Sequence, residues 1–152
     1  MTGITCDGLD KLGDDIQRII DETPEKRREL HEQIADLLES ELNKNIDSSI
    51  NDLNGHVKIM QEKKVGSGGG YAAVHPKKGK RGKLSYGELT NYLENGHAIR
   101  KPNSNSGRYR PRIKIAFVNG GHFYQKTASS IEPKAIALAE KFVDNIIREL
   151  EG

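Results

Sequence analysis

A long amphipathic segment near the end of the sequence places the strongest constraint on the fold. From Glu132 to Leu150, apolar side chains recur every three or four residues, and Pro133 lies where the first turn of a helix would be. This spacing predicts a long helix with one apolar face. Such a face is normally covered by packing against another element. It consists of Ile136, Ala139, Phe142, Val143, Ile146, Ile147 and Leu150.

The same periodicity predicts two helices in the first third of the chain. The first spans about residues 9–20, and the second begins at Thr23-Pro24 and reaches about Asn45. Thr23 suits the N-cap position and Pro24 the first helical position, where the missing N–H of proline costs no hydrogen bond. Residues 2–6 alternate weakly in polarity and predict a short edge strand.

A hairpin is predicted after these helices. Its strands are His56–Lys64 and Tyr71–His75, and the glycines of Gly66–Gly70 form a flexible tip between them. A phosphate-binding loop needs Lys-Ser or Lys-Thr after its glycines, and this stretch has neither. We therefore interpret the glycines as a turn rather than as a nucleotide site.

A short inserted helix and a further strand complete the pattern. Ser85 and Glu88 have the spacing of a capping box, which indicates a helix start, and Gly96 supplies the helix end. Arg112–Val118 alternates polar and apolar residues and predicts a strand, whereas Phe123–Ala128 predicts a short helix.

The expected fold class is therefore α+β. We predict a small antiparallel sheet packed against a long C-terminal helix, with two N-terminal helices and one inserted helix. A chain of 152 residues suits a single domain over 1–152, with flexible basic loops at about 76–84 and 97–111.

Neither catalysis nor metal binding is predicted. Cys6 is the only cysteine, and no histidine pairs with a second ligand at a metal-binding spacing. No nucleophile, base and oxyanion donor assemble in the pattern. We therefore expect no enzyme, no cofactor and no metal. The five histidines are His31, His56, His75, His97 and His122.

A membrane protein is also not expected. No apolar run approaches the roughly 18 residues of a membrane span. The first residues lack the basic and apolar regions of a signal peptide.

Charge is strongly segregated along the chain. Residues 1–62 carry a net charge of −8, residues 63–114 carry +11, and residues 115–152 carry −1. Such segregation bears on partners rather than on the fold. The basic middle is expected to meet either nucleic acid or the acidic part of a neighbouring copy.

The basic candidates cluster in two loops. Such charge attracts phosphates without reading sequence. Solvated loops, DNA contact and docking onto an acidic neighbour all remain open. The candidate DNA-facing or partner-facing residues are Lys77, Lys78, Lys80, Arg81, Lys83, Arg100, Lys101, Arg108, Arg110 and Arg112.

The acidic candidates lie on the predicted N-terminal helices. A solvated helix face explains them as readily as docking does. The possible acidic docking face comprises Asp14, Asp15, Asp21, Glu22, Glu32 and Asp36.

The order of four features resembles the minor tail-component family of tailed bacteriophages, also called the tail-completion or head–tail joining family. These features are Gly8-Leu9-Asp10 with a helix after it, the Tyr71-Ala72 strand, the Leu93–His97 turn, and Gly121-His122-Phe123-Tyr124 before the closing helix. In residue terms, Leu93–Gly96 corresponds to the family's hydrophobic-Glu-x-Gly turn. Gly121–Phe123 corresponds to its Gly-x-aromatic entry to the last helix.

The resemblance implies a non-enzymatic virion protein that oligomerises as a ring and joins the tail to the head connector. Its implied partners are further copies of itself, the phage head connector, the tail tube and terminator proteins, and DNA passing through the lumen. Its implied location is the virion neck or tail, and the host cytoplasm during assembly. The alternative is a small nucleic-acid-binding module that uses the basic central loops without sequence specificity.

Overall fold

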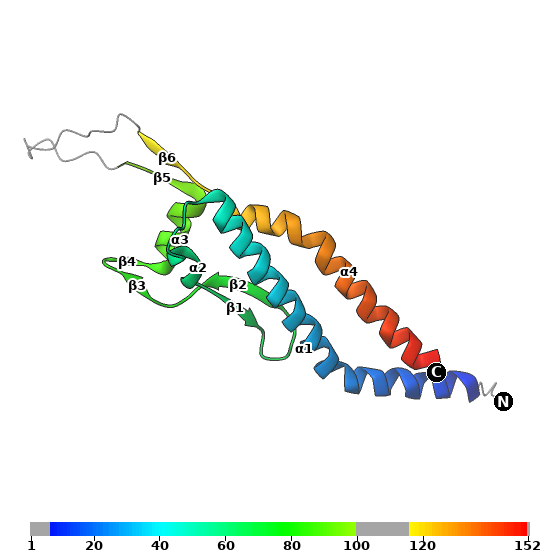
Figure 1. The fold of residues 1–152 in the computed structure, drawn as a ribbon. Helices are drawn as coiled ribbons and strands as arrows, with labels where there is room; N and C mark the ends of the chain where they lie inside the picture. The colour runs from blue at the N-terminus through cyan, green and yellow to red at the C-terminus, as the bar shows by residue number, and fades with distance from the viewer. Residues whose placement is uncertain (1–6, 100–115, 152) are drawn as a thin grey trace, which may run out of the picture. The chain divides into compact units, whose positions relative to one another are not determined.

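The computed structural model describes residues 7–99 and 116–151, and Figure 1 shows the order of their helices and strands. The side chains of residues 7–20 and of Glu22 lie outside this description, as does the strand expected at residues 2–6. The elements are α1 (Asp7–Ser49), α2 (His56–Ile59), β1 (Gln61–Val65), β2 (Ala72–Pro76), β3 (Lys80–Arg81), β4 (Leu84–Ser85), α3 (Tyr86–Asn95), β5 (Gly96–Ala98), β6 (Phe117–Asn119) and α4 (Phe123–Glu151).

The chain divides into two compact units. The first unit contains Met1–Glu39, Lys63–Val74 and Ser130–Gly152, and the second contains Ser40–Glu62 and His75–Ser129. Both α1 and α4 contribute to each unit. We describe each unit by itself.

The α+β class is confirmed, including the inserted helix α3 and the long C-terminal helix α4. Among the described residues, the strands pair as three two-stranded sheets, β1 with β2, β3 with β4, and β5 with β6. The expected single sheet is thus distributed over three separate pairs of short strands.

The prediction of two N-terminal helices is wrong. A single helix, α1, runs for 43 residues with Pro24 inside it. Proline at that position removes one backbone donor and usually bends a helix, and Figure 1 shows a bend in the blue part of α1. Thr23-Pro24 fits a helix start, but the flanking residues keep the helical periodicity on both sides of it and the helix continues.

The strand predicted from His56 is also corrected. Residues 56–59 form the short helix α2, and the strand begins only at Gln61. Asp52 decides this, because its carboxylate accepts hydrogen bonds from the backbone N–H groups of Val57 and Lys58 at 3.0 and 3.3 Å. The strand predicted at residues 71–75 is confirmed as β2.

The glycine-rich tip between β1 and β2 packs on α1 instead of standing free. Gly69 is buried with a φ of +63°, and a Cβ there would lie 2.8 Å from the Cα of Arg28. Only glycine permits both this backbone conformation and this close approach. The Arg27 guanidinium adds a 3.2 Å hydrogen bond to the carbonyl of Gly68.

The two helices predicted near the C-terminus are one helix. α4 starts at Phe123 and continues through Pro133 to Glu151. Its apolar face is covered only in part. Phe142 and Ile146 are half-buried, whereas three other members of the face are exposed by 44–52%. These three are Ile136, Val143 and Ile147.

Most of the buried side chains belong to the second unit. Phe123 and Ile46 are fully buried, and Leu42 is 1% exposed. In the described part of the first unit, the buried apolar side chains are Ala35 and Ile131. The core therefore forms where the end of α1 meets the start of α4. The remaining buried apolar residues of the second unit are Val57 and Met60.

Candidate functional site

The basic stretch predicted as a loop at residues 76–84 contains a tight β-hairpin. β3 and β4 are antiparallel, with Lys80 opposite Ser85 and Arg81 opposite Leu84, which leaves a two-residue turn. We call this stretch the basic hairpin. Its five basic side chains are all exposed, and they are Lys77, Lys78, Lys80, Arg81 and Lys83.

An aromatic residue anchors the basic hairpin. The backbone N–H of Tyr86 donates to the carbonyl of Gly79 at 2.9 Å. The ring of Tyr86 covers Gly79 so closely that a Cβ there would lie 2.4 Å from it. Tyr86 is the first residue of the neighbouring helix α3, so the anchor lies outside the basic stretch itself.

The charge of the basic hairpin is left almost uncompensated. In the described part of the chain, none of its five cations forms an ion pair. The Glu88 carboxylate lies nearby and accepts from both the backbone N–H and the hydroxyl of Ser85 at 2.8 Å. These two bonds, and to a lesser extent Lys80, lower the pKa of Glu88 below its ordinary value.

Ser85 and Glu88 complete the predicted capping box. The N–H of Glu88 donates to the Ser85 hydroxyl at 3.2 Å, while the Glu88 carboxylate reaches back to the N–H of Ser85. This reciprocal pair satisfies two backbone donors at the start of α3. The helix ends at Gly96 as expected.

An apolar groove of about 470 Å³ lies in the second unit beside the basic hairpin. α2, β4 and α3 supply its apolar walls, and Arg81 of the basic hairpin lines it as well. We call it the α2–α3 groove. Its lining residues are Ile50, Asn51, Asp52, His56, Val57, Met60, Arg81, Leu84, Leu89, Tyr92, Leu93 and His97.

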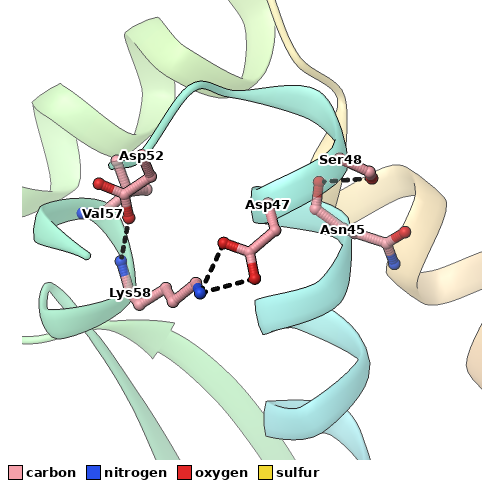
Figure 2. A network of polar contacts seen from close by, with 6 residues as sticks. All are labelled: Asn45, Asp47, Ser48, Asp52, Val57 and Lys58. Atoms are coloured by element: carbon pink, nitrogen blue, oxygen red, sulfur yellow. Dashed lines mark hydrogen bonds and ion pairs between the residues drawn. The ribbon is translucent and has the colours of Figure 1, made fainter. Parts of the chain in front are cut away.

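Two acidic residues hold α2 in position at this groove. The Asp52 carboxylate accepts from the N–H groups at the start of α2, and the Lys58 ammonium pairs with Asp47 at the end of α1 (Figure 2). The Asp52 carboxylate is therefore engaged by the backbone of its own chain. Among the described lining residues, Arg81 is the one lysine or arginine, and it forms no ion pair within the described part of the chain.

Two of the four features behind the phage resemblance contact each other. The Glu94 carboxylate accepts from the backbone N–H groups of Tyr124 and Gln125 at 2.9 and 3.1 Å. It thereby caps the first turn of α4, where free N–H groups and the helix dipole favour a negative charge. The Gly121 N–H adds a 2.7 Å bond to the Leu93 carbonyl.

Gly96 allows these motifs to come this close. Its φ is +79°, and a Cβ there would lie 2.2 Å from the carbonyl oxygen of Val118. β5 and β6 pair directly at this point, with Gly96 opposite Asn119. The sequence predicted Gly96 as a helix end, but the close approach of a distant strand became visible only in the structure.

A buried polar network joins β1, α3 and α4. The Gln61 side chain donates to the Thr90 hydroxyl at 3.0 Å and accepts from the Tyr124 hydroxyl. Burial, with a smaller contribution from the charge of Glu94, raises the pKa of Tyr124 to about 12. This network positions structural elements, since none of its members lines the groove.

The acidic candidates differ in how far their charge is neutralised. Asp36 pairs with Lys63, which also lies 3.4 Å from Glu39, and Glu32 accepts from Arg28 at 3.2 Å. Asp21 is exposed. Part of the predicted acidic face therefore forms ion pairs with basic residues of the same chain. The side chains of Asp14, Asp15 and Glu22 lie outside the described residues.

Much of the second basic cluster also falls outside the description. Residues 100–111 of the predicted loop and residues 112–115 of the predicted strand lie outside the described residues. The basic candidates among them are Arg100, Lys101, Arg108, Arg110 and Arg112. The described end of that strand is β6.

No group of three or more histidine, cysteine or acidic side chains gathers as a metal site within residues 7–99 and 116–151. None of the helices in those ranges combines the length and the apolar character that crossing a membrane requires.

The groove was missed at the sequence level because its walls come from four separate segments. Leu89 and Leu93, four residues apart on α3, were the available signal, but that spacing also fits an ordinary core.

Comparison of the chain with protein-family models, with curated proteins and with solved structures finds no match.

Proposed function

We propose that this chain is a structural protein of a phage neck, which oligomerises as a ring and joins the tail to the head connector. The observation that carries the proposal is the presence of exposed surfaces of different character on one small chain. The second unit presents an uncompensated basic hairpin beside an apolar groove. The first unit presents exposed aliphatic side chains on α4.

Exposed apolar surface of this kind supports an assembly role. Contiguous exposed apolar patches often mark interaction sites, whereas single exposed apolar side chains are ordinary. Phe117 and Val118 on β6 are 48% and 42% exposed, in addition to the exposed residues of α4. A protein that completes its burial only within an assembly gains part of its stability from its neighbours.

Deletion of the gene from a phage genome tests the proposal. We expect DNA-filled heads without tails, together with unjoined tails, in electron micrographs of the lysate. Wild-type protein supplied in trans should restore joined particles. Normal joined tails in the absence of the gene would overturn the proposal.

The basic hairpin gives a second test in the same complementation assay. Replacing its five cations by glutamate should preserve the circular dichroism spectrum, because exposed loop charges contribute little to folding. The variant should nevertheless fail to restore joined particles. Full complementation would show that the hairpin is only a solvated surface. Lys64→Glu, which reverses an exposed cation on β1, serves as the control.

Nucleic-acid binding is the second candidate function, and the exposed basic hairpin is what favours it. In that case the purified protein binds DNA, and log affinity falls linearly with log salt concentration. The hairpin variant should reduce both the affinity and this slope. A flat titration at low salt would remove this candidate and leave the neck proposal in place.

A further inference from the structure

Three exposed apolar side chains of α4 form a stripe, and the charged residues three or four positions away from it are acidic. Ile136, Val143 and Ile147 are separated by seven and four residues, so they lie on one side of the helix. We call these three residues the α4 stripe. The charged residues three or four positions away from any of them are Glu132, Glu140, Asp144 and Glu151.

The basic residues of this part of α4 lie on another side. Lys134 and Lys141 line a hollow that faces α1, together with Gln33 and Leu37. The α4 stripe therefore offers an apolar strip whose charged residues three or four positions away are carboxylates. Arg148 directly follows Ile147, about 100° further around the helix.

This charge pattern decides which partner fits. If two copies paired through the same stripe, carboxylates would face carboxylates, and juxtaposed like charges weaken association. A partner surface that is apolar at its centre and basic at its edge fits instead. The stripe can contact it as helical side chains spaced by about one and two turns.

The α2–α3 groove has both properties. Its walls are mostly aliphatic or aromatic, Arg81 lines it, and Lys80 and Lys83 lie beside Arg81 on the basic hairpin. The lining carboxylate, Asp52, already accepts two backbone hydrogen bonds. The other titratable groups of the lining are His56, His97 and Tyr92.

We propose that the α4 stripe of one copy docks in the α2–α3 groove of a second copy. Each chain then uses two different surfaces, and a contact of this heterologous kind closes a ring when it is repeated around an axis. Val143 and Ile147 enter the groove, while Glu140 and Asp144 face Lys80 and Arg81. This inference rests on the proposed function for the ring and names the interface that builds it.

Mixing two variants tests this interface by sedimentation velocity. The stripe variant is V143D/I147D, and the groove variant is R81E/Y92D. All four side chains are exposed, so both variants should keep the wild-type circular dichroism spectrum and melting temperature. We expect the wild-type chain to self-associate and each variant alone to remain monomeric.

The equimolar mixture should form a heterodimer and nothing larger, because one intact stripe and one intact groove remain. A groove variant that still dimerises alone would show stripe-to-stripe pairing and overturn the proposal. A monomeric mixture, or a wild-type chain that is monomeric at the highest attainable concentration, would overturn it as well. Ile59→Asp provides the matched control, because Ile59 is 62% exposed but belongs to neither surface.

A charge exchange keeps the proposal falsifiable if a stripe or groove variant proves unstable. E140K/D144K and K80E/R81E should each weaken self-association about tenfold or more. The chain that carries all four changes should recover most of the affinity. Absence of recovery would contradict the pairing.

These results stand apart from the test of the neck function. Loss of self-association only in the variants, combined with normal tails in the deleted phage, would leave the interface and refute the neck. If every variant self-associates like the wild-type chain and the deleted phage gives tailless heads, the neck function stands and the proposed interface is refuted.

Discussion

At the start of α4, Phe123 is fully buried and Thr127 is 4% exposed, whereas further along the same helix Ile136 and Val143 are about half exposed. In the second unit, Asn45 donates to the Thr127 hydroxyl at 2.9 Å and Lys126 donates to Ser49 at 2.7 Å. The end of α1 thus covers the start of α4 with both apolar and polar groups.

The first unit is held in a different way. The Lys26 side chain pairs with Glu149, and a hollow of about 290 Å³ lies between Leu30 of α1 and Phe142 and Ile146 of α4. Exposed ion pairs contribute little to stability, and a hollow contributes fewer packing contacts. One amphipathic helix is thus buried at its start in the second unit and keeps part of its apolar face exposed in the first.

The largest expected change in the free energy of unfolding is the one that distinguishes the start of α4 from its end. Phe123→Ala should lower the free energy of unfolding by about 3–5 kcal/mol, because it leaves a cavity in the core. Val143→Ala should change it by less than about 1 kcal/mol, because the side chain is already half exposed. Urea denaturation measures both. Similar losses would mean that the end of α4 is packed as tightly as its start.

Glycine-to-alanine substitutions should also affect the stability of the two units differently. Gly96→Ala in the second unit should cost about 2 kcal/mol or more, because φ is +79° and the new Cβ would lie 2.2 Å from the Val118 carbonyl oxygen. Gly70→Ala in the first unit should be neutral or slightly stabilising, because nothing lies within 4 Å of the new methyl group. Thermal unfolding of the two variants compares them. A neutral Gly96→Ala would argue against the contact between β5 and β6.

The Glu94 cap comes next in size. Glu94→Ala should cost about 1–2 kcal/mol, because two N–H groups at the start of α4 lose their acceptor. Glu25→Ala, which removes an exposed carboxylate of α1, is the control and should change little. Equal behaviour of both variants in urea would show that Glu94 is not a cap.

Tyr124 makes the second unit sensitive to alkali. Because burial raises the pKa of Tyr124 to about 12, its neutral form is favoured in the folded state. Below about pH 10 the Tyr124 hydroxyl is neutral in both states, so the free energy of unfolding does not depend on its ionisation. From about pH 10 to 12 the free energy of unfolding should fall, because the hydroxyl ionises first in the unfolded state. Tyr124→Phe should show a shallower fall in unfolding free energy over that range. An identical pH profile would place the sensitivity elsewhere.

The ion pairs of the first unit should give the smallest effect. Asp36, followed by Glu39, raises the pKa of Lys63 above its ordinary value. Lys63→Ala should therefore produce a slight, salt-sensitive loss that disappears at high ionic strength, because exposed charges are screened. Melting temperatures at low and high salt measure it. A loss that persists at high salt would indicate a packing role for the lysine stem.

Local signals predicted α3 and β2 because each depends on neighbouring residues. Ser85, Glu88 and Gly96 specify the start and end of α3 within a dozen positions. The same local reasoning misplaced the breaks at Pro24 and Pro133. Proline at these positions fits a helix start as well as a helix interior that gives up one hydrogen bond. Flanking periodicity, rather than the proline, decided between the two.

The candidate surfaces were predictable only in part. Charge along the sequence located the basic hairpin, since five cations in seven residues cannot all be neutralised locally. The α2–α3 groove was not predictable, because its walls are brought together by tertiary packing from segments up to about 47 positions apart. The exposure of Val143 and Ile147 was likewise hidden, because periodicity shows that a helix has an apolar face but not how much of that face is covered.

The amino-acid sequence by itself determined the α+β class, the long closing helix, the capped helix α3 and the segregation of charge. All of these follow from the periodicity, hydrogen-bonding capacity and ionisation of residues that are near one another in the chain. Tertiary structure alone decided that Glu94 caps α4, that Gly96 admits a distant strand and that the α4 stripe stays exposed. Each of these three features depends on which distant segment of the chain packs against the residue. That segment determines whether an apolar or charged side chain is buried.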